Sequence, residues 1–328
     1  MPEPLRIVLV GKTGVGKSAS ANTILGREAF DSEITPSSVT AKCAKESEII
    51  DGREVYVVDT PGLFDTNHSK EEIAKEIAKC ICLASPGPHA FCVTIQLGRF
   101  TEEEQETVKM IQKVFGKEAS KYTMTLFSHG DRLKRQTIEE FVSKSTELKA
   151  FTDQCRGGRH VFNNEDQGNR AQVTELLRKI DKIVAANGGG YYTTEMFQKA
   201  EEEIEKEKEK ILKENKKQRE REMEELRRKI QDKDKLNQAL QDLRVKHERD
   251  ARKKAELSNG FIGAFCGLAL GGIAGALLGG CIGIVGGPIG VIAGLAVGAG
   301  AGAAIGAAIG AGTGVAAAKA QVGKCTIQ

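Results

Sequence analysis

Residues 11–18 read GKTGVGKS, which fits the phosphate-loop pattern GxxxxGK[ST]. Glycines let such a loop curl so that its amide groups, and the positive end of the following helix, point at phosphates. Lys17 would reach the β- and γ-phosphates as a catalytic group, and Ser18 would bind Mg²⁺. The pattern predicts a nucleotide site, for which the loop supplies Gly11, Thr13, Gly14, Val15, Gly16, Lys17, Ser18 and Ala19.

Two further segments supply candidate metal ligands. Asp59 begins the stretch DTPG at the end of an apolar run, where an aspartate holds Mg²⁺ and the amide of Gly62 senses the γ-phosphate. Thr40 is the third expected Mg²⁺ ligand and a catalytic residue, because a threonine between the two motifs can close over the metal as a switch. Thr35, Ser37 and Ser38 compete for that role, and a plain surface loop is the alternative.

The base is expected to be guanine. Residues 128–131 read SHGD, and Asp131 would accept hydrogen bonds from guanine N1 and the exocyclic amine, a donor pair that adenine lacks. Ser128 and His129 depart from the usual [NT]KxD box, and His129 could stack on the base instead of the usual lysine. Asn163 and Asn164 are expected to touch the guanine edge, with an ordinary turn as the alternative.

Short apolar runs alternate with helical patterns through the first part of the chain. This alternation predicts an α/β three-layer sandwich with a mostly parallel sheet, forming a nucleotide-binding domain over residues 1–194. The expected strands are 5–10, 55–58, 89–96, 121–127 and 159–162. The expected helices are 17–24, 70–82, 101–115, 137–149 and 169–186.

Composition narrows the class of protein. The 328 residues carry a net charge of +3, too small for the basic field that nucleic-acid binding needs. The eight cysteines form no CxxC pair, and we expect them to be reduced and packed as small apolar residues. No secretory signal is recognisable, because the first apolar run leads directly into the phosphate loop. A cytosolic domain is expected.

Residues 195–258 are rich in Glu, Lys, Arg and Gln and contain neither Gly nor Pro. These residues favour a long charged helix. Met223, Leu226 and Ile230 fit a heptad seam, but Lys233 and Asn237 interrupt it. A coiled coil is one interpretation, and a solvated helix packing one short face on the globular domain is the alternative.

Residues 259–320 form a Gly/Ala-rich apolar segment, in which 260–318 contain no charged residue. Glycines recur every fourth residue in two arrays whose phase slips at Pro288, which predicts two helices packed through small residues. The length suffices for two membrane spans, so we expect a membrane hairpin; a flexible tail is the alternative. Residues 321–328 end in a CaaX-like sequence, in which Cys325 could be farnesylated.

A longer stretch carries a family resemblance. Residues 83–90 (LASPGPHA) and 95–104 (IQLGRFTEEE) resemble the signature box of the immunity-associated nucleotide-binding GTPases, the GIMAP family. The resemblance covers residues 5 to about 210 and places the chain near septin-like and chloroplast-import GTPases. It implies a GTP- and Mg²⁺-binding domain that forms homodimers or family heterodimers through the nucleotide face. It also implies attachment to the cytosolic face of an intracellular lipid membrane, and a role in immunity or cell survival.

The residue after DTPG bears on hydrolysis. Many small GTPases have a glutamine there to orient water, whereas this chain has Leu63, so a lone protomer should hydrolyse GTP slowly. Arg99 could act in the partner's site as a catalytic arginine finger, or pair with the acidic run at 102–104. The candidates are a GTP-switched membrane protein, a dynamin-like remodelling enzyme and a scaffold without turnover.

Overall fold

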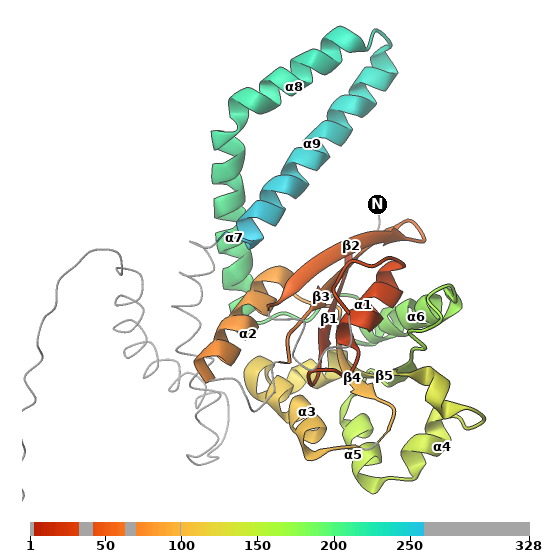
Figure 1. Ribbon diagram of the computed structural model, residues 1–328. Helices are drawn as coiled ribbons and strands as arrows, with labels where there is room; N and C mark the ends of the chain where they lie inside the picture. Colours follow the sequence, from red (N-terminus) through yellow and green to blue (C-terminus); the bar gives the residue numbers. More distant parts are fainter. Residues whose placement is uncertain (1–2, 33–41, 63–69, 99, 259–328) are drawn as a thin grey trace, which may run out of the picture.

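The computed structural model describes residues 3–32, 42–62, 70–98 and 100–258, and structural statements below concern these residues. They form a six-stranded sheet in the order β2-β3-β1-β4-β5-β6. All neighbouring pairs are parallel except β2 with β3, which are antiparallel (Figure 1). The strands are β1 (Leu5–Val10), β2 (Ala44–Ile50), β3 (Arg53–Asp59), β4 (Ala90–Gln96), β5 (Thr123–Ser128) and β6 (Arg159–Val161).

Helices cover both faces of the sheet, and alternate side chains of the strands feed two separate cores. Val8 and Phe91 belong to the core under α2, α3 and α5, whereas Ile7 and Leu126 belong to the core under α1 and α6. This explains why the strands are apolar throughout and confirms the predicted three-layer α/β sandwich. The helices of this domain are α1 (Lys17–Leu25), α2 (Lys70–Ala84), α3 (Glu102–Phe115), α4 (Ile138–Ser143), α5 (Thr146–Gln154) and α6 (Ala171–Ala186).

Two elements differ from the prediction. Strand β2 was not expected, because its sequence AKESEII is polar and lacks the apolar run of a central strand; it lies at the sheet edge, half-buried. It reaches β3 through a tight turn in which Asp51 and Gly52 both have positive φ. The single helix expected over 137–149 is two, because Ser145 begins α5 by accepting a hydrogen bond from the Leu148 amide at 3.1 Å.

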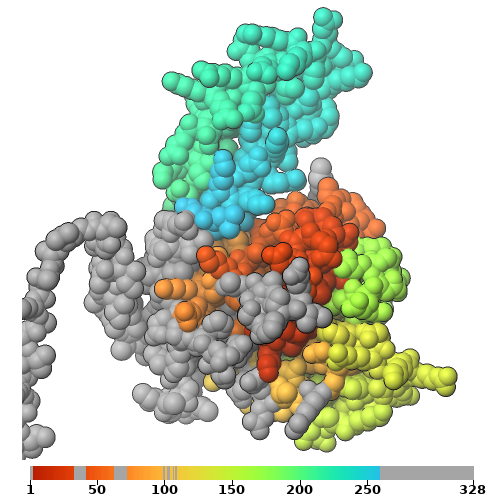
Figure 2. Space-filling view, in the orientation of Figure 1, coloured from red at the N-terminus to blue at the C-terminus, as the bar shows by residue number. Residues whose placement is uncertain are grey.

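Residues 195–258 are helical and charged as expected, but they do not form one continuous helix. They form α7 (Glu195–Glu214), α8 (Lys216–Lys229) and α9 (Lys233–Glu256). Asp232 stops the run by capping α9, its carboxylate accepting from the amides of residues 234 and 235. The chain therefore turns back, and α9 packs beside α7 to form an arm that stands away from the sheet (Figures 1 and 2).

The base of this helical arm packs on the α/β domain. Phe197, Ala200 and Ile204 of α7 are buried in the core under α2, which matches the alternative of one short packed face. Met223 and Leu226 of the proposed heptad seam are only half-buried, and the coiled coil stays a prediction. None of the described helices is both long and apolar enough to cross a bilayer. The segments 259–320 and 321–328 lie outside the described residues.

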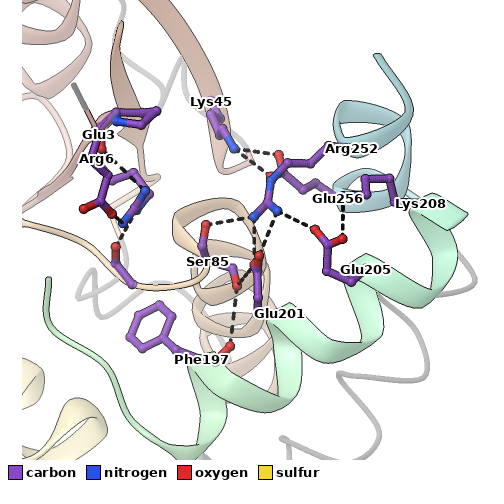
Figure 3. A network of polar contacts seen from close by, with 12 residues as sticks. Glu3, Arg6, Lys45, Ser85, Phe197, Glu201, Glu205, Lys208, Arg252 and Glu256 are labelled. Carbon is purple, nitrogen blue, oxygen red and sulfur yellow. Dashed lines mark hydrogen bonds and ion pairs between the residues drawn. The ribbon is translucent and has the colours of Figure 1, made fainter. Parts of the chain in front are cut away.

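An ionic cluster fastens α9 to α7 and to the domain (Figure 3). The guanidinium of Arg252 contacts Glu201 at 2.7 Å and Glu205 at 3.1 Å, both on α7. It also contacts Glu256 on its own helix at 3.0 Å. Glu256 is buried, and its second partner is the ammonium of Lys45 on β2, 2.7 Å away. One chain of ion pairs thus joins the edge strand to both helices of the arm.

Candidate nucleotide-binding site

The phosphate loop follows β1 and leads into α1, as its sequence predicted. Gly11 packs so closely on β4 that a Cβ there would lie 2.6 Å from the Thr94 carbonyl oxygen. Gly16 has a left-handed backbone at the start of α1, with φ of 88°. These positions require glycine, and the resulting loop has the curvature that lets backbone amides surround a phosphate.

Three side chains of the predicted phosphate and metal site converge at this loop. The ammonium of Lys17 donates to the Gly11 carbonyl at 3.0 Å and to the Lys12 carbonyl at 2.8 Å, so it lies over the loop. Ser18 Oγ donates to Asp59 Oδ2 at 2.6 Å. A hydroxyl and a carboxylate in contact provide the oxygen donors that Mg²⁺ prefers, so the residues present fit a magnesium-bound nucleotide.

The DTPG segment packs directly on the phosphate loop. A Cβ at Gly62 would lie 2.1 Å from Thr13 Oγ1 and 2.9 Å from the Thr13 amide nitrogen. Thr60 is anchored on the other side, where its hydroxyl donates to the Leu9 carbonyl at 2.7 Å. The contact places Gly62 beside the loop, where the γ-phosphate is expected, and explains why this position needs glycine.

The guanine box is tied to the phosphate loop by Ser128. Its buried hydroxyl donates to the Val15 carbonyl at 2.6 Å. A Cβ at Gly16 would also lie 3.3 Å from Ser128 Cβ. The departure from asparagine or threonine at the first box position therefore has a structural role, since this side chain sets the spacing between the base and phosphate subsites.

The rest of the box is shaped by backbone geometry. His129 has a left-handed backbone, with φ of 59°. Burial, and to a smaller extent the positive charge of nearby Arg132, lowers the pKa of His129, which favours a neutral ring. Gly130 donates its amide to the Phe162 carbonyl at 2.8 Å and has no room for a side chain. Asp131 is exposed at the end of this turn, as a carboxylate that accepts from guanine must be. Stacking of His129 on the base stays a prediction.

The two asparagines after β6 have different surroundings. Asn164 is inserted between two residues of α1: its Oδ1 accepts from the Thr23 hydroxyl at 2.9 Å, and its Nδ2 donates to Ser20 Oγ at 3.2 Å. Asn163 Oδ1 accepts from the Glu165 amide at 3.1 Å, closing its own turn. The structure thus brings Asn164 to the nucleotide end of α1, while Asn163 serves its loop.

Sequence reasoning missed residues that hold the site from a distance. Ser20 and Thr23 hold Asn164, although both look like ordinary helix residues. Arg170 donates to the carbonyls of Thr23 at 2.5 Å and Ile24 at 2.8 Å, capping the end of α1. Its partners lie 146 or more residues away, so no local pattern could have revealed this role.

Two expected catalytic residues, Thr40 and Arg99, lie outside the described residues, and so does Leu63, which stands at the usual position of the water-orienting glutamine. Glu104, in the acidic run considered as a partner for Arg99, accepts from the Thr101 amide at 2.8 Å and so forms a capping box at the start of α3. The assignments of Thr40 and Arg99 stay predictions.

The sequence and the assembled site agree with one protein family. A family model described as the AIG1 family matches residues 5–211, which is more than half of the chain. The chain belongs to the AIG1 family. The resemblance to GIMAP proteins is thereby confirmed, and with it a P-loop GTPase-type domain.

Named relatives of this AIG1-family chain come from animals and plants. It is similar to GTPase IMAP family member 8 of Homo sapiens, at 38% identity over 191 residues, covering 57% of this chain and 29% of the human protein. It is similar to immune-associated nucleotide-binding protein 9 of Arabidopsis thaliana, at 38% over 205 residues and 60% of each chain. The aligned part therefore spans less than two thirds of either relative.

Among solved structures, Toc33 from Arabidopsis thaliana in complex with GDP and Mg²⁺ is similar in fold, with a TM-score of 0.45 and 18% identity. The match covers 58% of this chain and 87% of the Toc33 chain.

The two parts of the family signature separate in space. Residues 95–98 cover the end of β4 and the two residues after it, on the nucleotide side, whereas residues 83–90 run from the end of α2 to the first residue of β4, at the opposite end of that strand. There Gly87 is packed so tightly that a Cβ would lie 1.9 Å from the Tyr192 carbonyl oxygen. Arg6 donates its side chain to the Gly87 carbonyl at 2.6 Å and its amide to His89 Nδ1 at 3.0 Å. Because Tyr192 leads into α7, this half of the signature packs where the helical arm joins the domain.

The cysteines behave as packed side chains where the structure describes them. Cys43, Cys80, Cys82, Cys92 and Cys155 are free and buried. Burial raises the pKa of Cys80 and Cys92 to about 12, so their thiols are protonated and unreactive. Within the described residues no group of three or more potential His, Cys, Asp or Glu ligands gathers around a common point.

Proposed function

We propose that this AIG1-family chain is a slow GTPase whose GTP-bound form dimerises through its nucleotide face, on the cytosolic side of an intracellular membrane. GTP would assemble the protein, and hydrolysis to GDP would reset it. The names of its relatives suggest a role in immunity or cell survival. The observation that carries the proposal is a phosphate loop joined to the guanine box, combined with Leu63 at the usual position of a water-orienting glutamine.

The described part of the site supplies the groups proposed to bind the nucleotide. Lys17, Ser18 and Asp59 converge at the phosphate end, and exposed Asp131 lies at the base end. When bound, Mg²⁺ would neutralise charge between the β- and γ-phosphates. Hydrolysis breaks the bond from the γ-phosphorus to the bridging oxygen as water attacks, and something must orient that water. Since leucine cannot, we infer that a second protomer supplies the missing group.

Arg99 is the proposed group. From the signature stretch 95–104 it would reach the partner's γ-phosphate, as an arginine finger worth roughly 10³–10⁵ in rate. Single-turnover GTP hydrolysis should then rise with protein concentration and fall in Arg99→Ala. A rate that is independent of concentration, or unchanged by this substitution, argues against catalysis by a partner.

The nucleotide-driven dimer itself is tested by size-exclusion chromatography with light scattering. Among the described residues, one hydrophobic core extends to Ala255 and the other to Val184, so a chain ending at residue 258 retains both and leaves out the apolar segment. We expect a monomer with GDP and a dimer with a non-hydrolysable GTP analogue. The same mass with both nucleotides would contradict the proposal and favour a scaffold that does not switch.

Membrane attachment rests on the charge-free stretch 260–318, proposed to insert as a helical hairpin, with farnesylation of Cys325 as a second anchor. Flotation of the full chain with vesicles, compared with a chain ending at 258, tests insertion. Equal flotation of the two would remove the apolar segment as anchor. Mass spectrometry of protein from eukaryotic cells shows whether Cys325 carries a prenyl group.

The helical arm favours a second candidate function. An arm that stands away from the GTPase domain and is fastened at its base by Arg252 resembles a lever, as a dynamin-like membrane-remodelling enzyme would use. GTP-dependent tubulation of liposomes by the full chain would favour this candidate over a switch that only assembles.

A further inference from the structure

A shallow pocket lies near the amino-terminal ends of β5 and β6, at the end of the sheet opposite to the nucleotide site. It is formed by the C-terminal half of α6, the 3-10 turn η1 (Lys117–Tyr122) before β5, and the loop before β6. Strands β5 and β6 begin at this end of the sheet, whereas the phosphate loop and the guanine box follow the carboxyl ends of β1 and β5 at the opposite end. The pocket is therefore separate from the site described above.

The charge of this pocket differs from that of the two grooves beside α9. Its charged lining consists of four cations, Lys121, Arg156, Lys179 and Lys182, and no carboxylate lines it. The remaining lining residues, Gly157, Ile183, Ala186 and Asn187, are apolar or neutral. By contrast, the two grooves beside α9 are lined by acids and bases together, so their charges can compensate one another.

Ion pairs with neighbouring acids compensate only part of this charge. Lys179 lies 3.0 Å from Glu175, and Lys121 lies 2.5 Å from Glu118, a carboxylate that is 71% exposed. Arg156 and Lys182 are exposed and form no ion pair with any of the residues that the structure describes. Like charges gathered in one hollow repel each other, and a bound anion would relieve that repulsion.

The backbone that presents these cations is fixed. A Cβ at Gly157 would lie 2.6 Å from Ile183 Cδ1 and 2.7 Å from the Thr123 carbonyl oxygen, so this loop fits against α6 and β5 only with glycine. The Gly157 amide donates to the same Thr123 carbonyl at 2.8 Å, and the Arg156 amide donates to the Ser120 carbonyl at 3.1 Å. Arg156 therefore extends from a turn that these two backbone hydrogen bonds fix, next to the apolar lining residues Ile183 and Ala186.

We propose that this pocket binds a phosphate monoester group, carried either by a free polyphosphate or by a lipid headgroup. A guanidinium can bind two phosphate oxygens at once, and the lysines add point charges around it. The C-terminal end of α6 contributes about half a negative charge, which four cations outweigh. The inference is independent of the proposed dimerisation through the nucleotide face, because the pocket lies at the opposite end of the sheet from that face.

The test uses the full chain saturated with GDP and Mg²⁺, so that added phosphates cannot enter the nucleotide site. Inositol hexakisphosphate is titrated by calorimetry against wild type and the double variant Arg156→Gln/Lys182→Gln. The control is Lys217→Gln/Arg221→Gln, which removes two exposed charges from α8. We expect the pocket variant to bind at least about tenfold more weakly, and the control to bind within twofold of wild type.

A second arm identifies the source of the phosphate. Flotation is compared between phosphatidylcholine vesicles with and without phosphatidylinositol 4-phosphate, using the same three proteins, since the apolar segment contributes equally to each. If phosphatidylinositol 4-phosphate increases flotation of wild type and control but not of the pocket variant, the ligand is a lipid headgroup. If the pocket variant is weaker only in calorimetry, the ligand is a free phosphate compound. Absence of binding to wild type in both arms, or an equal loss in the control, overturns the proposal. Unchanged GDP affinity shows that each variant is folded.

Discussion

The hydroxyl of Ser128 lies 2.6 Å from the carbonyl oxygen of Val15, to which it donates a hydrogen bond. The bond joins the start of the guanine box to the middle of the phosphate loop, across 113 residues of sequence. Both ends are buried, so water cannot replace the donor if it is removed. The relative position of the two subsites of the AIG1 domain depends on this contact.

Ser128→Ala should therefore weaken both the fold and the ligand site. The Val15 carbonyl would lose its donor, at a cost of about 1–3 kcal/mol in the free energy of unfolding, and GDP should bind about tenfold more weakly. Urea unfolding and calorimetric titration of GDP measure these changes. Ser143→Ala is the matched control, since its exposed hydroxyl donates to the Glu140 carbonyl at 2.9 Å. Equal effects of the two substitutions would remove the special role of Ser128.

Gly62→Ala should interfere with the phosphate end. The new methyl would lie 2.1 Å from Thr13 Oγ1, so either the DTPG segment or the phosphate loop must move. We expect affinity for a GTP analogue to fall by more than about tenfold. Gly190→Ala provides the control, because a Cβ there meets nothing within 4 Å. Calorimetry that finds wild-type affinity in Gly62→Ala would show that this contact is not needed for binding.

The buried His89 should make stability depend on acid. Burial, with Arg6 and Arg53 nearby, lowers the pKa of His89 to about 3, whereas the unfolded chain would bind this proton near pH 6.5. Between pH 6.5 and pH 3 the unfolded state therefore binds more protons than the folded state. The part of the folding free energy that His89 contributes is fully present above pH 6.5 and is lost as the pH falls toward 3. One such proton contributes a slope of about 1.4 kcal/mol per pH unit.

The comparison protein is His89→Gln, whose side-chain oxygen can still accept from the Arg6 amide. Its free energy of unfolding, measured by urea titration from pH 8 to pH 4, should fall less steeply with acid than that of wild type. Parallel curves would show that this histidine does not contribute. His160, whose pKa burial lowers to about 4, should leave a residual slope in both proteins.

Arg252→Ala should release the helical arm from the domain. The substitution leaves Glu201 and buried Glu256 without their guanidinium partner, and breaking a buried charge cluster costs about 3–5 kcal/mol. Limited proteolysis should then cut α9 faster. Arg228→Ala removes an exposed pair with Glu224, both side chains more than 60% exposed, and should have an effect of at most about 1 kcal/mol. Equal cleavage of the two variants would contradict the role given to this cluster.

Local patterns predicted the parts of the fold that depend on nearby residues. The phosphate loop, the central strands and the α6 helix each follow from short-range spacing and composition. Strand β2 escaped prediction because an edge strand needs no apolar run, and its pairing with β3 comes from the turn at Asp51. The reversal at Asp232 was hidden for a related reason: one capping residue inside a strongly helical composition decides it.

Long-range contacts explain what could not be predicted at the site. The positions of Asp131 and Ser18 in the fold could be predicted because each belongs to a motif with a fixed place relative to a strand. The roles of Ser128, Asn164 and Arg170 arise from partners on α1 and the phosphate loop that lie more than 100 residues away. Ser128 looked like a departure from the consensus, and only the contact with Val15 shows what it does.

The central claim is that this site holds a guanine nucleotide and that Asp131 selects the base. Competition binding of GTP, ATP and XTP to wild type and Asp131→Asn tests it most directly. Asp166→Asn, at an exposed carboxylate in the neighbouring loop, is the control. We predict that Asp131→Asn loses about 100-fold in GTP affinity and gains preference for XTP, because an amide can donate to the xanthine carbonyl. Unchanged preference for GTP in Asp131→Asn would contradict the account.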